Sequence, residues 1–297
     1  MSPSSTRVLV IYKKSAYQLY LVEGRHPAIK RLYRQGNPDA RDMRQAHEVH
    51  QRTLHTVIEH LKRRRVRFDL VYRATLTTTA RHNLIVAVGG DGTFLQASHL
   101  ITDAPMLGVN SDPKRSEAVF CAATAATFPH LFDQALAGHA PVLLVHRLQL
   151  MRNGHAILPL VLNDVLIAHP NPATMSRYRL QIGARAEYQK SSGLWIATAA
   201  GSSSAILAAG GRRLPWSSTR FQYRPREIYE GRLSRAHLRG ALLSSTARVD
   251  VTWLMREGAL FVDGPHLRHP LQFGDHIAAC PSRRHPLRVL SLHATSR

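Results

Sequence analysis

One segment constrains the fold of this chain more than any other. Leu84–Val88 is an unbroken apolar run of strand length, and it leads directly into Gly89–Thr93, which reads G-G-D-G-T. From Phe94 onward, apolar residues recur at the spacing of a helix. Glycines allow a sharp turn and a close approach to a ligand, and the N–H groups at the start of a helix attract anions. The segment therefore predicts a buried strand, a phosphate-binding turn and a helix.

Asp91 gives this turn a charge that a turn alone does not need. A carboxylate beside bound phosphates could accept a hydroxyl proton or hold a Mg²⁺ ion on the phosphates. A plain glycine-rich turn, in which Asp91 caps the following helix, is the alternative. The chain has no G-x-x-x-x-G-K-[ST] phosphate loop, and this turn is not a G-x-G-x-x-G fingerprint. These residues alone leave both interpretations of Asp91 open.

Short apolar runs alternate with helical patterns through the first half of the chain. Strands that alternate with helices predict a parallel sheet covered on both faces. We therefore expect residues 1–140 to form a Rossmann-like α/β domain that binds a nucleotide or phosphate. Its strands are predicted at Val8–Tyr12, Arg67–Val71, Leu84–Val88 and Met106–Val109, and its helices over Met43–Lys62, after Thr93 and over Phe128–Leu136.

The pattern changes near Pro141, where short strand-like stretches follow one another between turn residues. This predicts an all-β domain, an antiparallel β-sandwich over residues 141–279, interrupted by one small-residue helix at Ser202–Ala209. The tail, residues 280–297, is expected to pack back on the first domain. The sandwich strands are predicted at Leu143–Leu150, Ala156–Asp164, Tyr178–Ile182, Leu194–Thr198, Ala247–Trp253 and Ala259–Val262.

Two separated cysteines and the lack of a long apolar run exclude several classes of protein. Cys121 and Cys280 have no C-x-x-C spacing, which argues against a disulfide framework or a zinc site. No apolar stretch approaches the roughly 20 residues that span a bilayer, and a strand begins near Arg7 with no targeting segment before it. We therefore expect a cytoplasmic protein with no membrane partner and no metal bound by protein ligands alone.

The chain is strongly basic, with 40 Lys and Arg residues against 19 Asp and Glu and a net charge of +21. Such a charge attracts polyanions, including nucleotides, polyphosphate and nucleic acid, although compositional drift explains it equally well. The basic residues are scattered, and their one cluster, Lys62–Arg65, ends a predicted helix, where positive charge suits the macrodipole. Nucleic acid is therefore not expected as a partner.

The motifs of this chain resemble those of a known family. Val88–Thr93 resembles the G-G-D-G-T signature shared by NAD kinases, lipid kinases and phosphofructokinases. Further segments point to the NAD kinases, in the subgroup that includes the mitochondrial enzymes. Leu107–Glu117 resembles its G-V-N-T-D-P-x-R-S-E stretch, Leu162–Val165 its L-N-E-V element and Lys190–Ser202 its K-S-S-G-L…T-G-T-G-S stretch, while Phe221–Glu227 and Phe261–Gly264 also have counterparts. The motifs occur in the family order and cover nearly the whole chain.

The resemblance implies a kinase that transfers a phosphoryl group from ATP or another donor to the adenosine 2′-hydroxyl of NAD. Asp91 matches the family aspartate that acts on this hydroxyl, and Asn163 with Asp164 matches the pair that holds ribose hydroxyls. Mg²⁺ is expected on the donor phosphates and waters, and a homodimer or homotetramer is implied. The implied phosphate-binding residues are Gly89, Gly90, Gly92, Thr93 and Asn110, and the implied NAD-binding residues are Asn163, Asp164, Ser192, Thr198, Gly201, Ser202 and Ser203.

Two positions depart from the family pattern. Asp164 stands where the family has Glu, whose side chain is one methylene longer. Ala205 stands where family members carry an aromatic residue that packs on the adenine, and such stacking contributes about 1–3 kcal/mol. Two other functions therefore remain as alternatives: a lipid or other small-molecule kinase, and a catalytically inactive protein that binds nucleotides or nucleic acid. The sequence also leaves open ATP or polyphosphate as donor, and NAD or NADH as acceptor.

Overall fold

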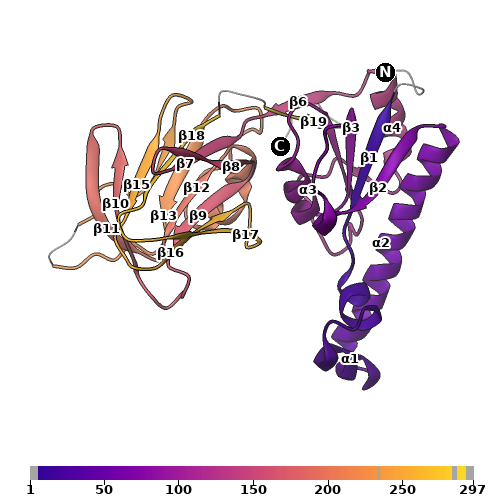
Figure 1. Cartoon of the computed structure of the whole chain (residues 1–297), viewed down its shortest axis with the longest axis horizontal. Coiled ribbons are helices and arrows are strands. Elements are labelled where there is room, and N and C mark those ends of the chain that lie inside the picture. The colour runs from indigo at the N-terminus through magenta and orange to yellow at the C-terminus, as the bar shows by residue number, and fades with distance from the viewer. Residues whose placement is uncertain (1–5, 233–234, 283–285, 292–297) are drawn as a thin grey trace. The chain divides into compact units, whose positions relative to one another are not determined.

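The computed structural model describes residues 6–232, 235–282 and 286–291. These residues form two compact units. Unit 1 is formed by the stretch that ends at Val142 together with the segment that begins at Arg288, and unit 2 is formed by Leu143–Leu287. Figure 1 shows a parallel sheet with helices in unit 1 and mainly strands in unit 2. The two units therefore have different architectures.

Sheet A is the framework of unit 1. It is a 7-stranded sheet in the order β2-β1-β3-β4-β19-β6, with β5 paired to β4. The pairs of β1 with β2 and β3, and of β4 with β3, β5 and β19, are parallel. The elements are β1 (Arg7–Tyr12), η1 (Gln18–Val22), α1 (Pro27–Arg34), α2 (Pro38–Arg63), β2 (Arg67–Tyr72), η2 (Arg73–Thr75), β3 (Leu84–Gly89), α3 (Asp91–Ser98), β4 (Met106–Asn110), β5 (Ala123–Thr124), α4 (Phe128–Ala137), β6 (Val142–Val145) and β19 (Leu287–Leu290).

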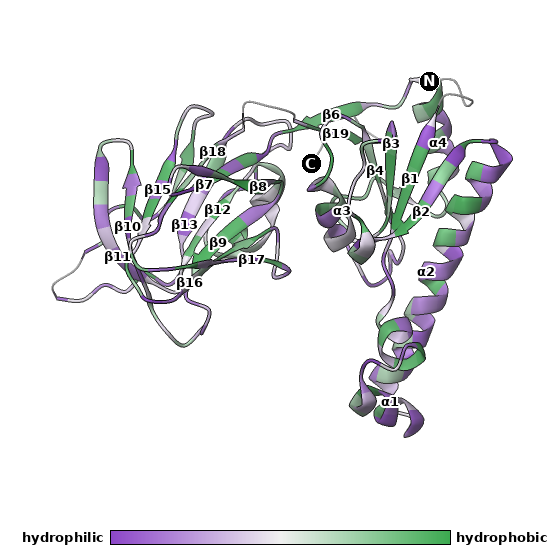
Figure 2. Cartoon of the chain, in the orientation of Figure 1, coloured by the Kyte–Doolittle hydropathy of each residue, from purple (hydrophilic) through white to green (hydrophobic). Residues whose placement is uncertain are grey.

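Helices cover both faces of sheet A. On one face, Val57 and Leu61 of α2 and Phe132 of α4 pack with the apolar side chains of β1, β3 and β4 in a single core. The alternate side chains of these strands face the other side, where α3 lies and Phe94 stacks on Phe120 with ring centroids 5.3 Å apart. Every residue of β3 and β4 is buried, as a parallel strand between two helix layers requires. The central strands of the sheet are mainly hydrophobic in Figure 2.

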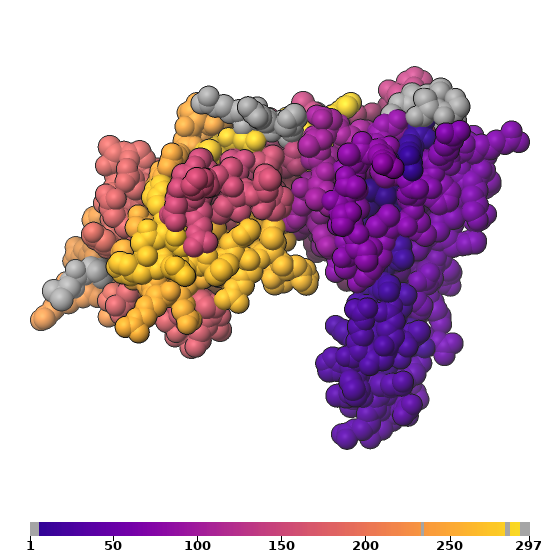
Figure 3. Space-filling model, viewed as in Figure 1, coloured from indigo at the N-terminus to yellow at the C-terminus, as the bar shows by residue number. Residues whose placement is uncertain are grey.

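Helix α2 is longer than the sequence pattern indicates. Its start has two clear signals, because the Asn37 side chain accepts a hydrogen bond from the Ala40 N–H and Pro38 occupies the first helical position. Between His50 and Leu61 its inner face packs on the sheet. The N-terminal half of α2, with α1 and η1, projects from the body of unit 1 (Figures 1 and 3).

Unit 2 is a sandwich of two antiparallel sheets. Sheet B has the order β11-β10-β15-β18-β7-β8 and sheet C the order β14-β13-β12-β9-β16-β17. Their inner faces share one core, in which Trp253 and Tyr178 are the largest fully buried side chains. The elements are β7 (Leu148–Arg152), β8 (His155–Val161), β9 (Asp164–Ala168), β10 (Ser176–Ile182), β11 (Arg185–Ser191), β12 (Leu194–Ala197), η3 (Ala200–Ser203), α5 (Ala205–Ala208), β13 (Phe221–Pro225), β14 (Ala241–Leu243), β15 (Val249–Trp253), β16 (Gly258–Val262), β17 (Leu267–Leu271) and β18 (His276–Pro281).

The predicted fold class is confirmed: the N-terminal part carries a sheet built on parallel pairs and the C-terminal part antiparallel sheets. None of the described helices has the length and apolar content that a membrane crossing requires. Three local predictions were wrong. Leu143–Leu150 is two strands, β6 in sheet A and β7 in sheet B, and Ala156–Asp164 is also two strands, β8 and β9, in different sheets. Ser202–Ala209 is a 3₁₀ turn followed by the short helix α5.

The core of unit 1 generates a stability prediction. Leu61→Ala removes a fully buried side chain between α2 and sheet A, so we expect the free energy of unfolding of unit 1 to fall by about 2–5 kcal/mol. Leu70→Ala is the matched control, because Leu70 lies on an adjacent element and is 41% exposed. Chemical denaturation of the two variants measures the difference, and equal losses would contradict the packing described here.

Candidate functional site

The carboxyl ends of four neighbouring strands meet at one edge of sheet A. In the order β2, β1, β3 and β4, these ends lead into Arg73, Lys13, Gly90 and Ser111. Open parallel sheets bind their ligands at this edge, because loops and helix N-termini collect there. The G-G-D-G-T turn therefore lies where a ligand of such a sheet is expected.

One glycine of this turn, Gly89, is required by a close contact, and a second, Gly90, lies just before the helix. Gly90 is the N-cap of α3 and has an extended backbone, with φ −128° and ψ −166°. A Cβ on Gly89 would lie 2.3 Å from Oγ1 of Thr93, so a side chain does not fit there. The helix begins at Asp91, and its first N–H groups, those of Asp91 and Gly92, have no acceptor within the helix. They leave an anion-binding end at the turn.

Asp91 does not cap its own helix. Its two carboxylate oxygens accept the N–H groups of Val119 and Phe120, at 3.0 and 2.8 Å. Burial raises the pKa of Asp91, and the two N–H groups oppose that rise. The carboxylate thus connects the phosphate turn to residues 119–120, and each oxygen keeps a further lone pair for a ligand.

Thr93 and Asn110, two of the predicted phosphate-binding residues, support the turn from within. Thr93 is 1% exposed and packs against Gly89. The Asn110 side chain donates to the carbonyl of Ser116 at 2.8 Å and accepts the N–H of Asp112 at 3.0 Å. Both polar atoms of Asn110 are therefore engaged in shaping residues 110–116.

Sequence reasoning missed Lys13 and Arg73, which also lie at this edge. They directly follow β1 and β2, whose paired ends are Tyr12 and Tyr72. The signal was present, because cations just after two predicted parallel strands must share an edge with the glycine turn. The scattered distribution of arginine along the chain hid it.

A second polar cluster lies in unit 2, where the chain bends between β8 and β9. Asp263 makes this bend by accepting the N–H groups of Leu162, Asn163 and Asp164 at 2.9, 2.7 and 3.1 Å. Its own N–H donates to the carbonyl of Asp164. The Phe261–Gly264 motif thus fixes the position of the Asn163-Asp164 pair, and this explains why the predicted strand over Ala156–Asp164 is broken.

Asp164 is the acid of this cluster and is only 4% exposed. Oδ2 of Asp164 lies 2.6 Å from the Ser204 hydroxyl and accepts the Asn163 side-chain amide at 3.1 Å. Burial raises the pKa of Asp164 to about 6, Asp263 adds to the rise and the Ser204 hydroxyl opposes it. Ser204, which sequence reasoning did not select, is half-buried and so is Asn163. The accessible polar groups of the cluster belong to these two residues.

Three other predicted NAD-binding residues hold the framework around this cluster. The Thr198 hydroxyl donates to the carbonyl of Leu162 at 2.6 Å and accepts the N–H of Gly201 at 3.0 Å. A Cβ on Gly201 would lie 2.0 Å from the carbonyl oxygen of Asn163, so only glycine fits. The Ser202 hydroxyl accepts the N–H of Leu214 at 2.8 Å. Ser203 is half-buried beside them.

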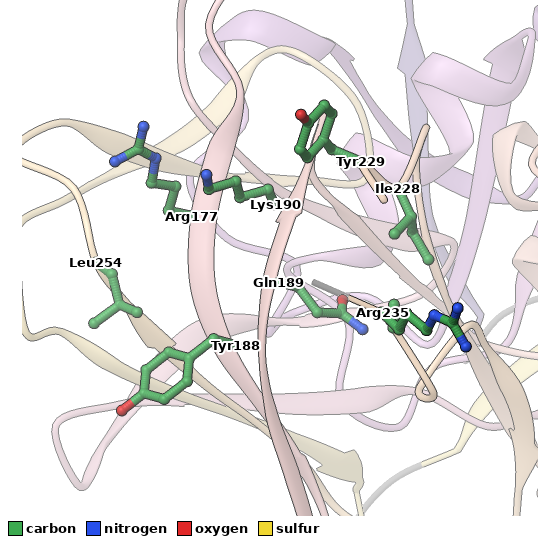
Figure 4. Close-up of a pocket in the computed structure, with 9 residues that line it drawn as sticks. Arg177, Tyr188, Gln189, Lys190, Ile228, Tyr229, Arg235 and Leu254 are labelled. Atoms are coloured by element: carbon green, nitrogen blue, oxygen red, sulfur yellow. The ribbon is translucent and has the colours of Figure 1, made fainter. Parts of the chain in front are cut away.

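Ser192 does not join this cluster within the unit. It precedes β12, whereas Thr198 follows it, so the length of the strand separates them. Lys190, two residues before Ser192 in the chain, lines a cavity of about 200 Å³ with a mainly apolar wall. Figure 4 shows Lys190 and Tyr229 among the residues that line it, and the Lys190 ammonium lies 5.7 Å from the ring centroid of Tyr229. Lys190 of the K-S-S-G-L segment thus lines this cavity and not the Asp164 cluster.

Among the described residues, no group of three or more His, Cys, Asp or Glu side chains could hold a metal ion. At the sheet A edge, the carboxylate of the phosphate turn, Asp91, already accepts two N–H groups. One carboxylate with spare lone pairs is compatible with a Mg²⁺ ion that takes its other ligands from phosphates and water.

Comparisons with known proteins relate this chain to one family. The family model of the ATP-NAD kinase N-terminal domain matches residues 30–139. The chain is 36% identical over 250 residues to a probable NADH kinase of Oryza sativa subsp. japonica, covering 76% of this chain and 77% of that protein. It is also 36% identical over 255 residues to the NADH kinase of Arabidopsis thaliana, covering 77% of this chain and 80% of that protein.

Solved structures share the fold. An NAD kinase from Archaeoglobus fulgidus in complex with ATP has a TM-score of 0.68 at 19% identity, covering 96% of this chain and 94% of that chain. Yeast NADH kinase complexed with NADH has a TM-score of 0.67 at 15% identity, covering 97% of this chain and 84% of that chain. The arrangement of a parallel sheet followed by an antiparallel sandwich is therefore the one these structures have.

The Asp164 cluster generates a titration prediction. We expect the Asp164 carboxyl to titrate near pH 6, and Ser204→Ala to raise its pKa further, because the hydroxyl stabilises the charged form. Since the folded pKa lies above the unfolded value, the stability from protonated Asp164 is present below about pH 4 and lost as the pH rises through 6. NMR of the carboxyl carbon measures the pKa. Ser203→Ala is the matched control, and an unchanged pKa in Ser204→Ala would contradict the contact.

Proposed function

This chain belongs to the NAD kinase family, and from that premise we propose that it phosphorylates the adenosine 2′-hydroxyl of NAD or NADH. The products are NADP or NADPH. The observation that carries this proposal is the position of Asp91, a carboxylate within a glycine-rich turn at the N-terminus of α3. A phosphate-binding turn that also holds a proton acceptor fits phosphoryl transfer to an alcohol.

Asp91 acts on the hydroxyl that receives the phosphoryl group. Phosphoryl transfer through a loose transition state needs little proton removal early, so a carboxylate can orient the hydroxyl and accept its proton late. The raised pKa of Asp91 makes it a better proton acceptor than an ordinary aspartate. The N–H bonds from Val119 and Phe120 hold the carboxylate in one orientation while it does so.

The Asp164 cluster holds a ribose of the acceptor. The Asn163 amide and the Ser204 hydroxyl are its accessible groups, and both can donate to and accept from a vicinal diol. Asp164 orients both of them through its Oδ2. Thr198, Gly201 and Ser202 shape the turn that carries Ser204. Direct contacts of Ser192 and Ser203 with NAD stay predictions from the family resemblance.

The donor is ATP or polyphosphate, and its phosphates bind at the glycine turn with Mg²⁺. The N–H groups of Asp91 and Gly92 face the anion at the start of α3. Mg²⁺ would be held mainly by the donor phosphates and by water, with Asp91 beside it, and it would supply charge neutralisation. A homo-oligomeric assembly and a cytoplasmic location stay predictions.

The role of Asp91 is tested with Asp91→Asn, which removes the charge and keeps an oxygen acceptor. We expect NADP(H) formation to fall by about a hundredfold or more, the range of general base catalysis. The measurement is NADP(H) formed per minute with ATP and Mg²⁺. Asp39→Asn is the matched control, because Asp39 is an exposed acid that also lies in the first turn of a helix. Full activity in a folded Asp91→Asn protein would refute the assignment.

The acceptor preference is a separate prediction. Two relatives that are 36% identical to this chain carry the name NADH kinase. The reduced nicotinamide ring also lacks the positive charge of the oxidised ring, which a chain of net charge +21 repels. We therefore expect kcat/KM for NADH to equal or exceed that for NAD. Parallel assays with both acceptors measure it, and a clear preference for NAD would show that charge does not set the choice.

A further inference from the structure

Two positively charged residues lie side by side at the carboxyl edge of sheet A, each directly after one of two neighbouring strands. Strands β1 and β2 pair in parallel register up to Tyr12 and Tyr72. Lys13 and Arg73 are the next residues on the two strands. Neither residue belongs to the phosphate-binding residues that the family resemblance implies. Their place beside the glycine turn comes from the strand order of this structure.

Arg73 is held against the first turns of α3. Its Nη1 lies 3.5 Å from Oγ1 of Thr93, and a Cβ on Gly92 would lie 3.3 Å from the same nitrogen. The carbonyl of Arg73 accepts the side-chain amide of Gln96 at 3.0 Å. The guanidinium therefore lies beside the N–H groups that form the anion-binding end of the helix.

Lys13 lies in the same neighbourhood and is half-buried. Burial and the nearby charge of Arg73 lower the pKa of Lys13, whereas Asp112 and Cys121 raise it. Asp112 is already paired with Arg115 at 3.4 Å. The carbonyl of Lys13 accepts Nε2–H of the buried His50 at 2.8 Å, which fixes the backbone at this point.

The charges of Lys13 and Arg73 are not neutralised by a salt bridge within the described residues. Their neighbours differ: Lys14 pairs with Glu23 at 2.6 Å and Arg7 pairs with Asp69 at 2.9 Å. Two partly buried positive charges repel each other and lack part of their hydration, which destabilises this edge of the sheet. A bound anion would offset both effects. Arg73 also lies beside the N-terminus of α3, which favours negative charge as well.

We propose that Lys13 and Arg73 form a clamp for the polyphosphate chain of the donor, whether that chain belongs to ATP or to inorganic polyphosphate. This inference rests on the proposed kinase function for its biological meaning. The clamp neutralises the phosphate charges and holds the chain against the start of α3. Arg73 supplies a planar set of donors and Lys13 a compact charge, a combination suited to neighbouring phosphate groups.

The test is direct binding to the full-length chain. Isothermal titration with Mg²⁺-ATP and with tripolyphosphate is carried out on the wild type, on Lys13→Met and on Arg73→Met. We expect Kd for the bound probe to rise roughly tenfold to a hundredfold in each variant, because a hydrogen-bonded charge is lost. In kinase assays, KM for the donor rises and KM for NAD(H) stays unchanged. Thermal unfolding checks that the variants fold.

Two control variants separate a clamp from a general effect of charge. Lys14→Met and Arg7→Met remove the same charges from cations that are already paired, and we expect Kd to stay unchanged. Arg73→Lys should recover part of the affinity, since it restores the charge but not the planar donors. At alkaline pH, donor binding should take up protons in the wild type and not in Lys13→Met, because an anion raises the pKa of Lys13.

The outcomes are distinguishable from those that test the kinase function. Loss of affinity for both probes supports a clamp for the shared phosphate chain, and loss for ATP alone supports a clamp that serves a nucleoside triphosphate. Unchanged Kd in both variants, equal losses in the controls, or no binding by the wild type would overturn the clamp. If the wild type binds the probes but forms no NADP(H), the kinase proposal fails and the clamp stands. If NADP(H) forms and the variants bind both probes normally, the clamp fails and the kinase proposal stands.

Discussion

The parallel register of β2, β1, β3 and β4 is the constraint on which the rest of unit 1 depends. Parallel pairing brings four carboxyl ends to one edge, although their residues are far apart in sequence. Because β3 and β4 are buried between two helix layers, their side chains are close-packed on both faces, and this packing holds the edge in place. Lys13, Arg73 and Asp91 therefore share a place that none of them could create locally.

In each unit an aspartate carboxylate accepts backbone N–H groups and so fixes the conformation of the segment that carries them. Asp91 accepts the N–H groups of Val119 and Phe120, and Asp263 accepts those of residues 162–164. Such bonds satisfy N–H groups that bent segments would otherwise leave without partners. The two acids differ in the lone pairs that these bonds leave available to a ligand. Asp263 is occupied by three bonds, whereas Asp91 keeps lone pairs at an anion-binding helix end.

The sequence predicts the regular parts of this protein well and the irregular parts poorly. Strands such as Leu84–Val88 and the fold class follow from apolar periodicity, because burial between two helix layers or on one face of a sheet leaves that pattern. Periodicity says nothing about which sheet a strand joins, so it predicts a single strand over Leu143–Leu150 and another over Ala156–Asp164. The bend between β8 and β9 depends on Asp263, about a hundred residues later, and local patterns cannot show so distant a contact. Lys13 and Arg73 become visible together only once the strand order is known.

The Asp164 carboxylate does not itself reach the outside of its cluster. It is only 4% exposed, and burial with the nearby Asp263 raises its pKa to about 6. Ser204 lies 2.6 Å from its oxygen and is half-buried, so the hydroxyl extends the reach of the recessed carboxylate. One hydroxyl proton serves either Asp164 or the carbonyl of Gly201, 2.7 Å away. The Ser204 hydroxyl therefore has two acceptors within reach for its single proton, one from the acid and one from the turn that carries Ser204.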